Sequence, residues 1–212
     1  MKTQAQISAI IEELKQLYPD ALCSLEYQKD YELLFSVRLA AQCTDARVNL
    51  VTPALFERFP TLEAFAAATP DEVGEYVRSC GFWRAKAKDI VGSAQMLLHD
   101  FGGKVPDNMD DLLRLPGVGR KTANLILGDV YGKEGYVCDT HCIRITGRLG
   151  ITDGSKDPLK VEQQLRKTIP PEESSDFCHR MVLHGRALCM ARGPKCEDCP
   201  LKTLCDYGTN PQ

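Results

Sequence analysis

The chain has 212 residues, of which 43% are hydrophobic and 26% are charged, and its net charge is −3. This composition is typical of a globular protein with a buried core, and it argues against a histone-like basic protein. No apolar run approaches the roughly 20 residues that a membrane helix needs, so no membrane partner is expected. Ten cysteines are many for this length, and the last four crowd into the C-terminus, which favours a soft-metal site over a secreted disulfide scaffold.

Helical periodicity dominates from the start of the chain. Ile7, Ile10, Leu14 and Leu17 share one face of a first helix, which therefore does not resemble a signal peptide. The apolar segment 33–41 also predicts a helix, because polar Asp45 and Asn49 continue its pattern.

Start and stop signals recur further along the chain. Thr69-Pro70-Asp71-Glu72 forms a capping box, and the helix that it starts is predicted to end at Gly81. Segment 102–103 closes another helix and 157–158 opens one more. Because no alternating strand pattern occurs, the sequence predicts an all-α fold with about ten helices.

A glycine-rich turn lies between two predicted helices at 108–115 and 120–131. Gly117 and Gly119 leave the backbone around Val118 bare, and the exposed amides of the following helix form an anion site beside Arg120 and Lys121. The segment is either a plain corner between helices or a helix-hairpin-helix that grips a DNA phosphate. Segment 112–150 carries six basic against three acidic residues, a net charge of +3, which favours DNA.

Four cysteines near the C-terminus have the spacing C-x6-C-x2-C-x5-C, and they are Cys189, Cys196, Cys199 and Cys205. Four thiolates in so short a loop can enclose one metal centre. Structural zinc is a serious alternative, but zinc sites usually pair two short knuckles and this run has a single CxxC. The uneven spacing favours a [4Fe–4S] cluster over zinc. Arg192 and Lys195 lie between the first two cysteines, and they are interpreted either as a second phosphate contact or as an ordinary solvated loop.

Several motifs together resemble one family. LPGVGRKTAN at 115–124, VCDTH at 137–141 and the four-cysteine tail occur in the order and spacing of endonuclease III, a DNA glycosylase/AP lyase family of the helix-hairpin-helix superfamily. AAQCTD at 40–45 and LHGR at 183–186 extend the similarity over almost the whole chain.

The resemblance implies roles for individual residues. Lys121 matches the catalytic lysine and Asp139 the catalytic aspartate, although an aspartate at a helix start is also an ordinary N-cap. Gln42 matches the residue that fills the gap left by an extruded nucleotide, and Phe82 lies where the family places an apolar wedge. The four cysteines match the ligands of the family's [4Fe–4S] cluster.

The resemblance also implies a two-lobed helix-hairpin-helix glycosylase fold with the active site in the cleft between the lobes. Residues 1–22 and 136–212, with the cluster loop at 189–205, are expected in one lobe. Residues 23–135, with the hairpin at about 108–131, are expected in the other.

The implied activity is bifunctional base excision repair. The enzyme would remove oxidised or ring-saturated pyrimidines from double-stranded DNA and cut 3′ to the abasic site by β-elimination. A carboxylate stabilises positive charge at C1′, and a lysine amine captures C1′ as a Schiff base. The alternatives are an adenine or mismatch-specific monofunctional glycosylase, which Lys121 argues against, and a non-catalytic DNA-binding module, which the presence of both Lys121 and Asp139 argues against. A monomer is expected, in the bacterial cytoplasm and associated with the nucleoid.

Overall fold

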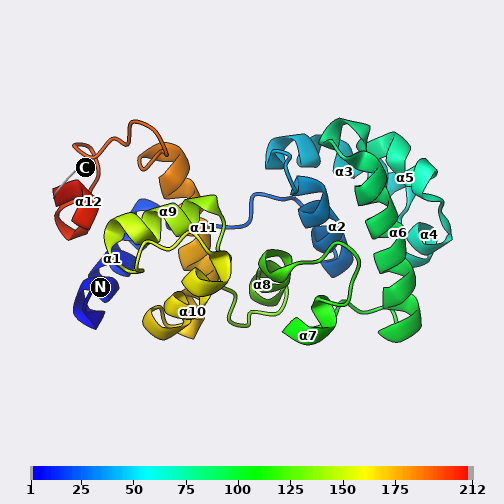
Figure 1. Cartoon of the computed structure of the whole chain (residues 1–212). Coiled ribbons are helices and arrows are strands. Elements are labelled where there is room, and N and C mark those ends of the chain that lie inside the picture. The colour runs from blue at the N-terminus through cyan, green and yellow to red at the C-terminus, as the bar shows by residue number, and fades with distance from the viewer. Residues whose placement is uncertain (1, 210–212) are drawn as a thin grey trace. The chain divides into compact units, whose positions relative to one another are not determined.

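The computed structural model describes residues 2–209, and all regular elements in that range are helices, so the all-α prediction is confirmed. The described chain forms two compact units (Figure 1). Residues 2–22 and 132–209 form one, called here the terminal unit, and residues 23–131 form the other, the central unit. None of the helices between residues 2 and 209 combines the length and the apolar character needed to cross a bilayer.

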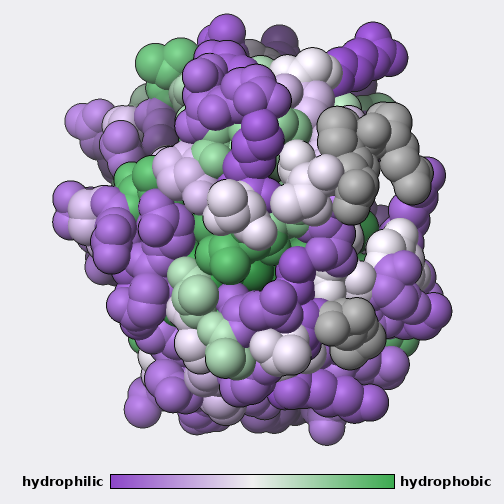
Figure 2. Space-filling view, turned by 90° about the vertical axis from the view of Figure 1, so that its left-hand side faces the viewer, coloured by the Kyte–Doolittle hydropathy of each residue, from purple (hydrophilic) through white to green (hydrophobic). Residues whose placement is uncertain are grey.

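The terminal unit begins with a helix whose buried face was predicted. Thr3 and Gln6 form a capping box at its N-terminus, and Ile7, Ile10 and Leu14 are buried where it packs on α11. The face of the molecule on the side of α1 and α12 is mostly hydrophilic and surrounds a small hydrophobic hollow (Figure 2). The helices of this unit are α1 (Gln4–Leu17), α9 (Thr140–Leu149), α10 (Pro158–Thr168), η2 (Pro171–Glu173), α11 (Ser174–Ala187), η3 (Lys202–Leu204) and α12 (Asp206–Thr209).

The central unit is built around a cluster of aromatic side chains. The Phe65 ring lies 5.0 Å from the Phe35 ring and 5.1 Å from the Phe59 ring, measured between centroids, and Phe35 and Phe65 are fully buried. Helices α4 and α5 both pack on the long α6 (Figure 1). The helices of this unit are α2 (Asp30–Ala40), α3 (Asp45–Arg58), α4 (Leu62–Ala67), α5 (Pro70–Val77), η1 (Arg78–Cys80), α6 (Trp83–Asp100), α7 (Met109–Leu112) and α8 (Arg120–Asp129).

Three predicted helices of the central unit differ from the observed ones. The helical pattern of 33–49 is broken at Gln42, whose φ of 55° reverses the chain before Thr44 caps α3. The helix that the Thr69 capping box starts ends at Val77 and tightens into η1, which reaches Gly81. The first hairpin helix, α7, is only one turn long. It ends at Leu112, and Leu113 is the C-cap residue before the glycine turn.

Candidate active site

The glycine turn of the hairpin lies against an ion pair of the central unit. Gly117 has a φ of +72°, and a Cβ atom there would lie 2.5 Å from Arg38 Nε and 2.6 Å from Asp89 Oδ2. These two side chains pair at 2.7 Å, and Ser93 Oγ donates to the carbonyl of Pro116 at 3.1 Å. The ion pair and the Ser93 hydrogen bond therefore hold the turn in place, and only glycine fits at position 117.

The N-terminus of α8 follows this turn without a side-chain cap. Gly119 is its N-cap residue, in extended conformation with φ −107°, and a Cβ atom there would meet nothing within 4 Å. Its first residues, Arg120 and Lys121, are exposed. Uncapped amides beside two cationic side chains make this end of α8 suited to an anion such as a phosphate.

Asp139 lies in the terminal unit and is the N-cap of α9. Its Oδ1 accepts from the N–H of Cys142 at 2.7 Å, which is the capping role expected of an aspartate at this position. The side chain is only half-buried, and its second oxygen is not part of that cap hydrogen bond. The helix thus fixes the carboxylate while one oxygen is left for other chemistry.

Gln42 and Phe82 lie on two short turns of the central unit, and they are the two residues other than glycine with positive φ in the described part of the chain. Gln42 is exposed between α2 and α3, with φ 55°. Phe82 follows Gly81, has φ 47° and leaves 71% of its surface exposed. Left-handed backbone at residues with a Cβ atom is costly and clusters at functional sites.

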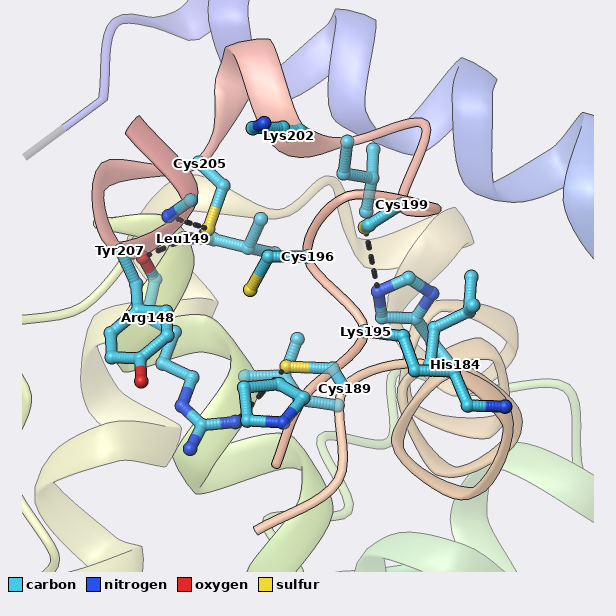
Figure 3. Close-up of a pocket in the computed structure, with 15 residues that line it drawn as sticks. Arg148, Leu149, His184, Cys189, Lys195, Cys196, Cys199, Lys202, Cys205 and Tyr207 are labelled. Atoms are coloured by element: carbon cyan, nitrogen blue, oxygen red, sulfur yellow. Dashed lines mark hydrogen bonds between the residues drawn. The ribbon is translucent and has the colours of Figure 1, made fainter. Parts of the chain in front are cut away.

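The four C-terminal cysteines line one pocket of the terminal unit (Figure 3). Cys189 follows α11, Cys196 and Cys199 lie in the next loop, and Cys205 precedes α12. All four are half-buried and none is in a disulfide. Within residues 2–209, no group of three or more His, Cys, Asp or Glu side chains is positioned to hold a metal ion.

Two of the four sulfur atoms lie beside hydrogen-bond donors of the kind that thiolate ligands accept from. Arg148 Nη1 donates to Cys189 Sγ at 3.3 Å, and the N–H of Gly208 donates to Cys205 Sγ at 3.3 Å (Figure 3). A guanidinium and a backbone N–H stabilise negative charge on sulfur. The residue types, four cysteines that line one pocket, are those of a centre bound by four cysteinates, although their sulfur atoms are not arranged around a common point.

Two arginines of α9 hold the loop between the first two cysteines. Arg144 donates through Nε and Nη2 to the carbonyl of Cys189, at 3.2 and 2.9 Å. Arg148 donates to the carbonyls of Met190, at 2.7 Å, and Ala191, at 3.1 Å. Arg192 and Lys195 lie on this loop and are exposed to solvent. The backbone that carries them is held by the hydrogen bonds from α9.

His184 lies in α11, lines the same pocket and is neutral near pH 7 (Figure 3). Burial lowers the pKa of its imidazole to about 4. The Tyr18 hydroxyl and Nδ1 share a hydrogen bond at 3.2 Å, and Nε2 lies 3.6 Å from Cys199 Sγ. His184 thus supports one cysteine of the pocket from the side of α11.

Sequence reasoning missed three supporting features. The Arg38–Asp89 pair beneath the glycine turn and the buried Lys86 join residues about fifty positions apart, which no local pattern indicates. Arg144 and Arg148 were counted only as local positive charge. Their spacing of four residues places both on one face of α9, which was the available signal.

Comparisons with known proteins agree with this architecture. The family model described as "HhH-GPD superfamily base excision DNA repair protein" matches residues 35–171. Endonuclease III of Synechocystis sp. is 47% identical over 91% of this chain and 88% of its own length. Endonuclease III of Bacillus subtilis is 39% identical over 96% of this chain and 93% of its own length.

Solved structures give the same result. A structure described as a trapped endonuclease III–DNA covalent intermediate, in an estranged-adenine complex, has a TM-score of 0.92 and 42% identity, and covers 99% of this chain and 98% of its own. A thermostable thymine-DNA glycosylase has a TM-score of 0.84 at 20% identity over 97% of each chain, which shows the shared fold alone. The chain therefore belongs to the HhH-GPD superfamily of base excision DNA repair proteins and, within it, to the endonuclease III family of DNA glycosylase/AP lyases.

Proposed function

We propose that this glycosylase/AP lyase removes oxidised or ring-saturated pyrimidines from double-stranded DNA and then cuts the strand 3′ to the abasic site. The observation that carries the proposal is the exposed Lys121 in the first turn of α8, directly after an uncapped glycine turn. The endonuclease III relative at 42% identity forms a covalent intermediate with DNA that can be trapped, which supports an amine nucleophile here. Its estranged base is adenine, the partner of thymine, which supports a thymine-derived lesion.

The chemistry begins with loss of the damaged base. As the bond from C1′ to the base nitrogen breaks, its electron pair leaves with the base and positive charge develops on the sugar. The carboxylate of Asp139 stabilises that charge. The amine of Lys121 forms a bond to C1′; the C1′–O4′ bond then breaks, its electron pair and a proton from nitrogen go to the ring oxygen, and a protonated Schiff base remains.

The Schiff base then makes strand cleavage feasible. It acidifies the protons on C2′, and removal of one of them expels the 3′ phosphate by β-elimination. Water finally hydrolyses the Schiff base and releases Lys121. A chain without an amine at position 121 would release bases but would lack this second step.

DNA binding is assigned to four parts of the chain. The backbone of Gly117, Val118 and Gly119, with Arg120, takes one phosphate at the uncapped start of α8. Arg192 and Lys195 contact a second stretch of backbone. Gln42 occupies the place of the extruded nucleotide, and Phe82 holds the base stack open. We propose that the protein acts on damaged or abasic duplex DNA as a monomer, associated with the bacterial nucleoid.

The four cysteines would hold a [4Fe–4S] cluster. Cys189, Cys196, Cys199 and Cys205 supply four cysteinates, which are the usual ligands of such a cluster. When bound, the cluster orders the loop from Cys189 to Cys205. Its contribution to the reaction is thus to fix the two cationic side chains that contact DNA, without a part in the bond-breaking steps.

Borohydride trapping tests the proposed activity. The wild type and Lys121→Ala are incubated with a duplex that contains one thymine glycol, and borohydride is added to reduce a Schiff base to a stable adduct. We expect an adduct with the wild type and none with Lys121→Ala. Base release without an adduct in the wild type would mean a monofunctional glycosylase. Neither release nor adduct would refute thymine glycol as a substrate, and an abasic duplex then tests the lyase step alone.

A further inference from the structure

A lysine is buried in the middle of the central unit, beneath the two turns that carry Gln42 and Phe82. Lys86, in the first turns of α6, is 1% exposed. Its Nζ donates to the carbonyl of Leu39 at 2.8 Å and to the carbonyl of Cys80 at 2.7 Å. A charged side chain is almost never buried to this degree unless it is paired.

The two carbonyls come from the ends of two helices. Leu39 is in the last turn of α2, and Cys80 ends η1. Carbonyls at helix C-termini have no intrahelical partner and carry partial negative charge, so one ammonium group caps both ends. Gln42 follows Leu39 by three residues and Phe82 follows Cys80 by two, so each capped end leads directly into a left-handed residue.

The charge of Lys86 is not neutralised by a thiolate at Cys80. Burial raises the pKa of the Cys80 thiol to about 11, so this thiol is protonated at neutral pH. Desolvation lowers the pKa of Lys86 itself, which is the cost of burying the ammonium group. The two carbonyls are therefore the groups that hold this buried ammonium, and through it the two surface turns are linked.

We propose that Lys86 is a positioning residue that joins the two turns into one preformed DNA wedge. This inference rests on the roles proposed above for Gln42 and Phe82 in holding the duplex open. Neither left-handed turn is favoured by its own residue type, so each persists only where its surroundings impose it. Lys86 imposes both, and Gln42 and Phe82 then enter the duplex without ordering their turns on binding.

The proposal separates duplex opening from the chemistry that follows. A wedge matters only where a nucleotide must leave a base stack. An abasic site in a single strand has no stack to open, but it still reacts with Lys121. Loss of Lys86 should therefore impair the reaction on a duplex and spare the reaction on a single strand.

The test compares Lys86→Met with the wild type on two substrates. Base release from a thymine glycol duplex is measured under single-turnover conditions, and borohydride trapping is measured on a single-stranded abasic oligonucleotide. We expect Lys86→Met to lose at least about tenfold in rate on the duplex, because two buried carbonyls lose their donor and both turns relax. Trapping on the single strand should stay within about twofold of the wild type.

A matched control distinguishes positioning from general stability. Phe65→Leu removes buried contacts from the same unit without touching either turn, so it reports the effect of destabilisation alone. In the background of Phe82→Ala, where the wedge is already lost, adding Lys86→Met should have little further effect on the duplex rate. Equal losses on both substrates, or a duplex loss no larger than that of Phe65→Leu, would overturn the proposal.

Two further outcomes are distinguished from a failure of the proposal for Lys86. If Lys86→Met loses its helical circular dichroism signal, Lys86→Gln, which keeps one donor amide, takes its place with the same two substrates and the same criteria. If the wild type forms an adduct on neither the single strand nor the duplex, the proposed function of Lys121 fails. If the wild type reacts with both substrates and the Lys86 variant reacts at the same rates, only the role of Lys86 is refuted.

Discussion

Replacing Gly117 by alanine tests whether the glycine turn of the hairpin is fixed by the ion pair beneath it. The left-handed backbone costs an alanine about 1–2 kcal/mol. The new methyl group would also lie 2.5 Å from Arg38 Nε and 2.6 Å from Asp89 Oδ2, so the 2.7 Å pair must move apart. Loss of that charged hydrogen bond adds about 1 kcal/mol, and the total is about 2–3 kcal/mol.

Gly119→Ser is the matched control for this prediction. Position 119 has φ −107° and open space around the added side chain, and serine is a good N-cap, so its stability should change by only a few tenths of a kcal/mol. Thermal and urea unfolding at pH 7 are followed by circular dichroism. We expect Gly117→Ala to melt about 4–12 °C below the wild type. Equal unfolding midpoints for the two variants would refute the reasoning about the ion pair.

Two further predictions concern the cluster loop and a helix cap. Arg148→Met removes the donors to Cys189 Sγ and to two loop carbonyls. With an iron chelator present, we expect this variant to lose its absorbance at about 400 nm about tenfold faster than the wild type, whereas Arg192→Met should match the wild type. Equal rates for both variants would contradict the role of Arg148. The Thr69 N–H and hydroxyl hold the pKa of Glu72 below its usual value, so this carboxylate stabilises the fold above about pH 4 and loses that effect as the pH falls through its folded-state pKa. Urea midpoints of Glu72→Gln and the wild type should therefore differ at pH 7 and converge at low pH, and a constant difference would refute this account.

Local signals predicted the elements that local chemistry determines. The apolar face of α1 and the Thr69 capping box could be read directly, because each depends on residues within one or two helical turns. The Asp139 cap was likewise predictable from its position before α9. The family motifs then supplied the activity, because the order of the motifs is specific even where each alone is weak.

Long-range contacts were beyond such signals. Lys86 has the charge of a surface residue, and its burial depends on two helix ends that meet only in the fold. The break at Gln42 was missed for a related reason, since hydrophobic periodicity runs through it and the turn is imposed by tertiary contacts. The [4Fe–4S] assignment and the roles of the site residues stay predictions.

The order of the two units along the chain has a consequence for synthesis. The central unit is one continuous segment, so its contacts can form as soon as residue 131 has left the ribosome. Helix α1 packs on α11, which is translated more than 150 residues later. At typical elongation rates of about 5–20 residues per second, α1 waits about 8–30 seconds for its partner. During that interval the apolar face of α1 lacks the helix that buries it in the folded protein.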